Sequence, residues 1–134
     1  MKIHRNISQG SDAWLKLRAG KLTASEMHRL VSPLGKIRTG EGPETFLCEK
    51  VAERIMGQPL PQSDFFNGQQ GQWIEESARP AFTLETGFEV EQVGFIESDD
   101  GACGCSPDGL LVGTPGGQNA GLEIKCPMPQ TQME

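Results

Sequence analysis

Ser106-Pro107-Asp108-Gly109 and, a short distance further along, Leu122-Glu123-Ile124-Lys125-Cys126 are the two segments that decide the fold. The second segment has the apolar character of a strand, and alternate residues of a strand point to opposite faces. Glu123 and Lys125 therefore share one face. With Asp108 beside them, two carboxylates and an ammonium group would meet on one side of a sheet. The opposite face, which we expect to turn into a core, carries Leu122, Ile124 and Cys126.

Two carboxylates and a lysine in this arrangement favour a metal-dependent phosphodiesterase. Carboxylate oxygens suit hard divalent cations, and an ammonium group can stand beside an attacking water. We therefore expect one or two Mg²⁺ or Mn²⁺ ions as cofactors. A plainer interpretation remains for each residue. Pro-Asp-Gly forms turns by itself, and Glu123 and Lys125 would be ordinary on a solvated strand face.

The 134 residues fit one domain, and we expect a single domain over 1–134. The formal net charge of −6 weighs against DNA binding, which depends on basic side chains that neutralise phosphates. Part of this acidity can belong to a metal site. The basic residues are biased toward the N-terminal part of the chain, which contains Lys16, Arg18, Lys21, Arg29, Lys36 and Arg38.

The chain shows no signal for export or for membrane insertion. No apolar run approaches the ~20 residues that span a bilayer, and Met1-Lys2-Ile3-His4-Arg5 lacks the apolar stretch of a signal peptide. We expect a cytoplasmic protein without a membrane partner.

Four helices are predicted before the strands. The first covers 11–20, and Thr23-Ala24-Ser25-Glu26 fits a capping box for a second that reaches about Val31. Pro43 begins a third, which Gly57 ends. A fourth covers about 69–86, with Pro80 inside it. The buried stripe of the third helix is expected to consist of Leu47, Val51 and Ile55.

The remainder predicts a mainly antiparallel sheet. One strand is expected over 88–97 with a bulge near Gly94, and Asp99-Asp100-Gly101 is typical of a hairpin turn. A second strand over 102–112 is interrupted at Pro107, and a third covers 121–126. Helices followed by a meander indicate an α+β domain.

The chain resembles the lambda-exonuclease-like (YqaJ-type viral recombinase) branch of the PD-(D/E)XK nucleases. This resemblance covers nearly the whole sequence and implies a restriction-endonuclease-like core, with N-terminal helices packed on the sheet. A lone Glu-X-Lys is a weak signal, but five segments in the family's order are specific. They are Gln9 to Arg18, Leu22 to Glu26, Gly71 to Arg79, Cys105 to Leu110, and Leu122 to Pro127.

The resemblance implies a role for each site residue. Asp108, Glu123 and the backbone carbonyl of Ile124 would bind the metal, and Lys125 would position or activate the water. Glu75 would be the remaining acidic residue, although Glu76 competes for that role. A terminal 5′-phosphate would be held by Arg18, Ser25 and Ser106.

Simpler roles exist for several of these residues. Arg18 could be the cationic last turn of its helix, and Ser25 could be a cap. We expect Trp14 and Trp73 to be core or helix-packing residues, with base stacking as the alternative.

The resemblance implies a Mg²⁺-dependent deoxyribonuclease, most simply a 5′-to-3′ exonuclease on duplex DNA in phage or prophage recombination, with a single-strand annealing protein as a further partner. The sequence stops at Glu134, where the family continues, so the domain looks C-terminally truncated. We therefore expect weak or absent activity and a homo-oligomer formed through the edge of the strand over 121–126, by direct strand pairing or by exchange of the tail 127–134. The alternatives are a related metal-dependent endonuclease and a non-cleaving module that oligomerises or binds DNA or a partner.

Overall fold

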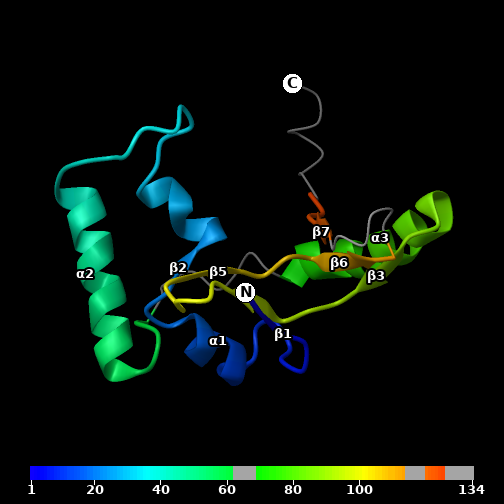
Figure 1. The fold of residues 1–134 in the computed structure, drawn as a ribbon, viewed down its shortest axis with the longest axis horizontal. Coiled ribbons are helices and arrows are strands. Elements are labelled where there is room, and N and C mark those ends of the chain that lie inside the picture. The colour runs from blue at the N-terminus through cyan, green and yellow to red at the C-terminus, as the bar shows by residue number, and fades with distance from the viewer. Residues whose placement is uncertain (62–68, 114–119, 126–134) are drawn as a thin grey trace. The chain divides into compact units, whose positions relative to one another are not determined.

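The structure, a computed structural model, describes residues 1–61, 69–113 and 120–125, with side chains omitted for 69–75. Contacts divide the chain into two compact units (Figure 1). Unit 1 combines Met1–Pro61 with Val93–Ser106, and unit 2 combines Gln62–Gln92 with Pro107–Glu134. Both units contain helix and strand, which confirms the predicted α+β class.

Unit 1 is built on a four-stranded sheet in the order β1-β4-β5-β2. Its strands are β1 (Lys2–His4), β2 (Leu22–Thr23), β4 (Phe95–Glu97) and β5 (Cys103–Cys105). The β1–β4 and β4–β5 pairs are antiparallel, with Ile3 opposite Ile96, whereas β2 and β5 are parallel. The expectation that helices precede all strands was wrong, because β1 and β2 are short early segments that join the sheet.

Three helical segments complete unit 1: α1 (Asp12–Arg18), the 3₁₀ helix η1 (Ala24–Arg29) and α2 (Glu41–Met56). The Ser11 hydroxyl oxygen accepts a hydrogen bond from the Trp14 backbone N–H at 3.3 Å and so caps α1 as predicted. Gly57 ends α2 at a positive φ of 66°.

The second predicted helix is corrected in extent and in its capping. It is a 3₁₀ segment that ends at Arg29, and Thr23 makes no side-chain cap bond. The Thr23 hydroxyl instead donates to Glu26 Oε2 at 2.6 Å. Two side chains that would have capped the backbone therefore bind each other, which leaves the tighter 3₁₀ turn.

The buried stripe predicted for α2 was also wrong. Leu47, Val51 and Ile55 are 45%, 58% and 81% exposed. The buried positions are Phe46, Lys50 and Glu53, and α2 contacts η1. This face is selected because Lys50 and Glu53 find charged partners there, a compensation that the apolar pattern cannot reveal. Phe46 joins Val93 and Phe95 as the fully buried side chains of the core.

The strand predicted over 88–97 is two strands in two sheets. β3 (Glu89–Glu91) ends before Val93, and β4 begins at Phe95. Between them, side chains bond to the backbone: Gln9 Nε2 donates to the Val93 carbonyl and Trp14 Nε1 to the Gly94 carbonyl. A Cβ at Gly94 would lie 2.1 Å from the Ile7 carbonyl oxygen, so only glycine allows this approach.

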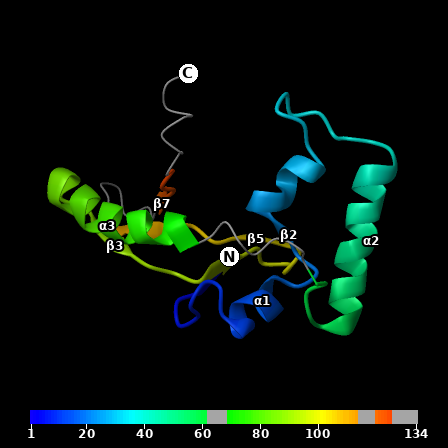
Figure 2. The same ribbon diagram turned by 180° about the vertical axis from the view of Figure 1, so that it is seen from behind.

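Unit 2 combines α3 (Gln69–Thr86) with an antiparallel sheet in the order β3-β6-β7. β6 is Gly109–Val112 and β7 is Ala120–Leu122, and α3 contacts β3 (Figure 2). Leu110 of β6 is buried. The third strand ends earlier than predicted, at Leu122, and Cys126 lies outside the described residues.

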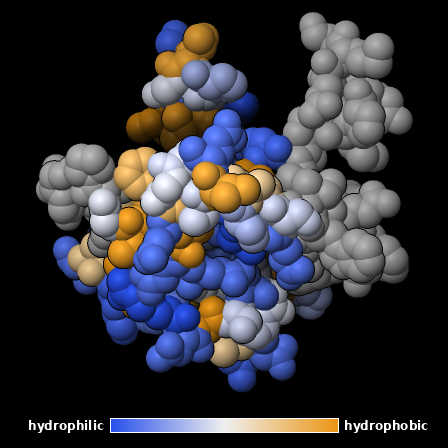
Figure 3. Space-filling view, turned by 90° about the vertical axis from the view of Figure 1, so that its right-hand side faces the viewer, coloured by the Kyte–Doolittle hydropathy of each residue, from blue (hydrophilic) through white to orange (hydrophobic). Residues whose placement is uncertain are grey.

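The described helices include none that is long and apolar enough to cross a membrane. The face drawn in Figure 3 is mostly hydrophilic, with hydrophobic residues in separate small groups.

Candidate functional site

Asp108, in unit 2, makes three hydrogen bonds, two through its backbone and one through its side chain. Its backbone N–H donates to the Leu122 carbonyl at 3.0 Å, and its carbonyl accepts from Arg79 Nε at 2.9 Å. Its side-chain Oδ2 accepts from the Ile124 backbone N–H at 2.5 Å. Leu122 of β7 and Arg79 of α3 therefore hold the Asp108 backbone, and the Ile124 N–H binds its carboxylate.

Glu123, Ile124 and Lys125 directly follow β7 instead of belonging to the strand as predicted. Of the three side chains predicted to meet, Glu123 and Lys125 do so, because Lys125 Nζ and Glu123 Oε1 form an ion pair. Both side chains are accessible, with 79% of Lys125 and 59% of Glu123 exposed. The Asp108–Ile124 bond thus ties the first motif to the middle of the second.

The donor set of these residues fits a hard divalent cation. Asp108 and Glu123 offer carboxylate oxygens and Ile124 offers a carbonyl, which are ligand types that Mg²⁺ and Mn²⁺ accept. One carboxylate oxygen of Asp108 accepts a hydrogen bond from the Ile124 N–H. The other oxygen can coordinate a cation. Within the described ranges no three His, Cys, Asp or Glu side chains gather as a metal site. Glu75 falls within α3, and its side chain lies outside the described part.

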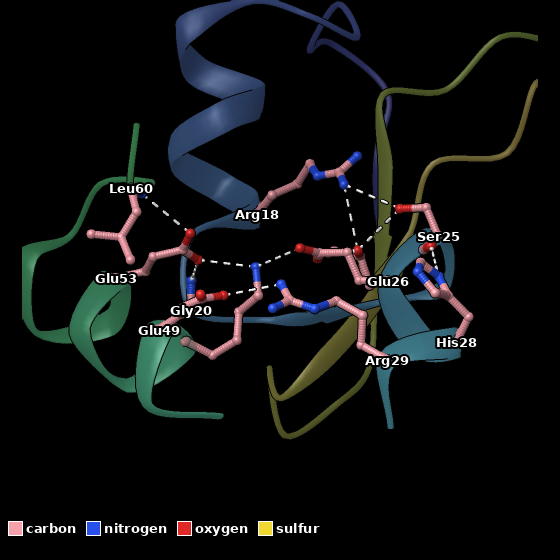
Figure 4. Close-up of polar contacts among 11 residues, drawn as sticks. Arg18, Gly20, Ser25, Glu26, His28, Arg29, Glu49, Glu53 and Leu60 are labelled. Carbon is pink, nitrogen blue, oxygen red and sulfur yellow. Dashed lines mark hydrogen bonds and ion pairs between the residues drawn. The ribbon is translucent and has the colours of Figure 1, made fainter. Parts of the chain in front are cut away.

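The expected phosphate-binding residues lie in unit 1, where Arg18 and Ser25 meet. Arg18 Nη2 lies 3.3 Å from Ser25 Oγ and 3.4 Å from Thr23 Oγ1 (Figure 4). Thr23 gives its hydroxyl proton to Glu26, so it acts as an acceptor toward Arg18. The guanidinium thus faces two hydroxyl groups at the junction of β2 and η1.

Ser106 is linked to the same helix through Trp14. The indole Nε1–H of Trp14 donates to Ser106 Oγ at 2.9 Å and to the Gly94 carbonyl at 3.1 Å. The guanidinium carbon of Arg18 lies 4.1 Å from the centre of the Trp14 ring, in cation–π contact. Arg18 and Ser106 therefore bind the same indole, one at its face and the other at its edge.

A buried cluster of charges underlies this region, on η1 and α2 (Figure 4). Lys50 Nζ lies 2.9 Å from Glu26 Oε1 and 3.2 Å from Glu53 Oε2. Glu53 also accepts from the backbone N–H groups of Gly20 and Leu60, at 3.0 and 3.2 Å. These bonds tie α2 to the turn after α1 and so fix the backbone close to Arg18.

Burial and neighbouring charges shift the pKa values of two side chains in this region. Burial lowers the pKa of the Arg18 guanidinium, against the opposing charges of Glu26 and Glu53. Burial by itself would raise the pKa of Glu26, but hydrogen bonds from Thr23 and Lys50 and the charges of Lys50 and Arg18 bring that pKa below its ordinary value. Arg18 stays cationic and Glu26 stays anionic near neutral pH.

Four residues that support these sites were not predicted to do so from the sequence: Trp14, Thr23, Lys50 and Arg79. One signal was available for Trp14, since it precedes Arg18 by four residues on a helix and so shares its face. Lys50 and Glu53 had no comparable signal, because charged residues are rarely buried unless they are paired.

Known proteins match both the sequence and the fold. The profile of the YqaJ-like viral recombinase domain matches residues 13–134. The chain belongs to this family. The resemblance inferred from the five segments is thereby confirmed for the YqaJ-like domain, while the role of each site residue stays a prediction. Curated protein sequences give no significant match.

Two solved structures of the alkaline exonuclease LHK-Exo from Laribacter hongkongensis resemble this YqaJ-like domain. Both are 28% identical in sequence, with TM-scores of 0.67 and, for the complex with dAMP, 0.69. The matches cover 92% of the present chain and 57% of LHK-Exo, so the chain spans little more than half the length of that enzyme. The likeness confirms the fold class and supports a nuclease.

Proposed function

We propose that this chain is a metal-dependent deoxyribonuclease, a 5′-to-3′ exonuclease on duplex DNA that serves phage or prophage recombination. Residues 1–134 would make up one nuclease domain. The observation that carries the proposal is the Asp108–Ile124 hydrogen bond, which joins the two segments expected to form the reaction centre. Membership of the YqaJ-like family and the likeness to an alkaline exonuclease support the reaction class.

Asp108, Glu123 and the Ile124 carbonyl would hold Mg²⁺ or Mn²⁺, with Glu75 as a further acidic residue. Such a cation, when bound, polarises a phosphate and lowers the pKa of a water. The protein would supply a prearranged ligand, because the Ile124 N–H binds one carboxylate oxygen of Asp108 and two further hydrogen bonds hold its backbone. Asp108 does not have to be ordered at the moment of binding.

Lys125 would act on the scissile phosphate. Its ammonium group is largely exposed and is held beside Glu123 by their ion pair. A cation fixed at this place can offset the negative charge that develops on phosphate oxygens and can orient the attacking water. In this proposal the ion pair with Glu123 keeps the Lys125 ammonium group beside a metal-binding carboxylate.

Arg18, Ser25 and Ser106 would bind the terminal 5′-phosphate. A guanidinium binds phosphate oxygens in a bidentate manner, and hydroxyl groups add donors around it. A site that accepts only an end would give the enzyme its polarity. The proposed partners are duplex DNA, a single-strand annealing protein and further copies of the chain.

The test is digestion of a linear 5′-phosphorylated duplex and of a supercoiled plasmid, with Mg²⁺ and with EDTA. The proposal predicts Mg²⁺-dependent loss of the linear duplex and an intact plasmid. Nicking of the plasmid would instead indicate an endonuclease. DNA binding without loss of either substrate would indicate a non-cleaving module, and both results contradict the exonuclease.

A further inference from the structure

We propose that Trp14 is a positioning residue that holds Arg18 and Ser106 as one anion-binding group. This inference rests on the proposed recognition of a 5′-phosphate. It assigns to Trp14 a role beyond core packing, since each polar residue of the group touches a different part of its indole ring.

The ring face of Trp14 orients Arg18. The two residues lie one turn apart on α1, and the guanidinium carbon lies 4.1 Å from the ring centre. The hydrogen bonds from Arg18 to Thr23 and Ser25 are long, at 3.4 and 3.3 Å, so they restrain the side chain weakly. The stacking contact with Trp14 is a further restraint, and it leaves the N–H groups at the edge of the guanidinium directed toward the hydroxyl groups.

The ring edge of Trp14 orients Ser106. An indole N–H can only donate, so Ser106 Oγ must be the acceptor in their 2.9 Å contact. The hydroxyl proton of Ser106 therefore points away from Trp14 and can donate to an anion. A hydroxyl group that accepts one hydrogen bond is also polarised to donate another more strongly.

Core packing alone does not require this arrangement. The Gly94 carbonyl accepts from the same indole N–H at 3.1 Å and would satisfy the indole by itself. The side chain of Trp14 is only partly buried. The Ser106 contact is thus additional to what the interior needs.

The experiment compares wild type with Trp14→Phe, Ser106→Ala and the double variant. Phenylalanine keeps a ring face for Arg18 and removes the N–H that holds Ser106. Duplexes with 5′-phosphate or 5′-hydroxyl ends are titrated in EDTA, so that no cleavage occurs, and the ratio of their dissociation constants is recorded. Trp73→Phe, the same substitution at the other tryptophan, is the control.

The preference for phosphorylated ends should fall roughly three- to tenfold in Trp14→Phe and in Ser106→Ala, as for the loss of one hydrogen bond. The double variant should lose no more than the more affected single variant, because Ser106→Ala already removes the hydroxyl group that Trp14 positions. A purely structural role would weaken binding to both ends equally and leave the ratio unchanged, which would overturn the positioning role.

A second measurement does not depend on whether the Trp14→Phe variant folds. The indole N–H signal of Trp14, identified with the Trp73→Phe protein, should move on addition of inorganic phosphate in the wild-type background and move less with Ser106→Ala. Equal movement in both proteins contradicts the inference. If wild type and Arg18→Ala bind both ends alike, end recognition itself is wrong. If those two proteins differ while Trp14→Phe matches wild type, only the role of Trp14 is wrong.

Discussion

The side-chain carboxylate of Asp108 accepts a hydrogen bond from the backbone N–H of Ile124, with Oδ2 and N 2.5 Å apart. This bond joins the bend before β6 to the residues that follow β7. Asp108 can therefore order the backbone at Pro-Asp-Gly and still serve as the proposed metal ligand. One carboxylate oxygen orders the backbone at Ile124, and the other is available to a cation.

Asp108→Asn and Asp108→Ala should separate folding from metal binding. Asparagine keeps an acceptor for Ile124, so its free energy of unfolding should stay close to wild type, whereas alanine should cost about 1–3 kcal/mol. Both variants should lose Mn²⁺ binding, measured by calorimetry without DNA. Wild-type Mn²⁺ affinity in Asp108→Asn would remove Asp108 from the ligand set.

Lys125→Ala should reduce Mg²⁺-dependent cleavage by on the order of 10²–10³, because a charge that faces the developing negative charge is lost. The side chain is 79% exposed, so the unfolding free energy should change little. Lys36→Ala, an exposed lysine in a loop of unit 1, is the matched control. A Lys125→Ala enzyme as fast as wild type would exclude the lysine from the mechanism.

Arg18→Ala should selectively slow the digestion of 5′-phosphorylated ends, with Arg18→Lys intermediate because an ammonium group lacks the bidentate fork. The measurement compares initial rates on phosphorylated and hydroxyl-ended duplexes. An equal loss on both substrates would make Arg18 a structural residue.

The buried cluster should make stability depend on pH. The pKa of Glu26 is lowered in the folded state, so its contribution is complete above the unfolded pKa of about 4.3 and is lost as pH falls through the lower folded value. In Glu26→Gln the unfolding free energy should therefore change less over this acidic range than in wild type. Chemical denaturation at a series of pH values measures the difference, and parallel curves would contradict the assignment.

Substitutions on the two faces of α2 should differ strongly in their effect on the free energy of unfolding. Phe46→Ala should cost about 3–5 kcal/mol, because Phe46 is fully buried. Val51→Ser should stay within about 0.5 kcal/mol of wild type, because Val51 is 58% exposed. A large loss of unfolding free energy in Val51→Ser would show that the stripe predicted from the sequence is buried after all.

Local patterns in the sequence predicted the elements that depend on local chemistry. The Ser11 cap, the end of α2 at Gly57 and the interruption at Pro107 all follow from one or two residues. The turn at Gly101 is likewise present, since its N–H donates to the Ser98 carbonyl and its φ is 69°.

Features that depend on distant partners were not predictable in the same way. The short strand β2 exists because it pairs with β5, far away in the sequence. The buried face of α2 depends on Lys50 meeting Glu26, and the break at Gly94 depends on Gln9 and Trp14. Periodicity in one segment contains no information on such contacts.

In the candidate site, too, local motifs were predictable and contacts with distant residues were not. The motifs singled out Asp108, Glu123 and Lys125, and the structure links Asp108 to Ile124 and pairs Glu123 with Lys125. The groups that support the proposed sites, Arg79 and Trp14, act through contacts with residues remote in sequence.

The most direct test of the central claim is Mg²⁺-dependent degradation of a linear 5′-phosphorylated duplex by wild type and by Asp108→Asn, both folded to the same extent. The account predicts that wild type shortens the duplex from its 5′ ends and that Asp108→Asn leaves it intact. Equal degradation by the two proteins, or no Mg²⁺-dependent degradation by wild type, would contradict it.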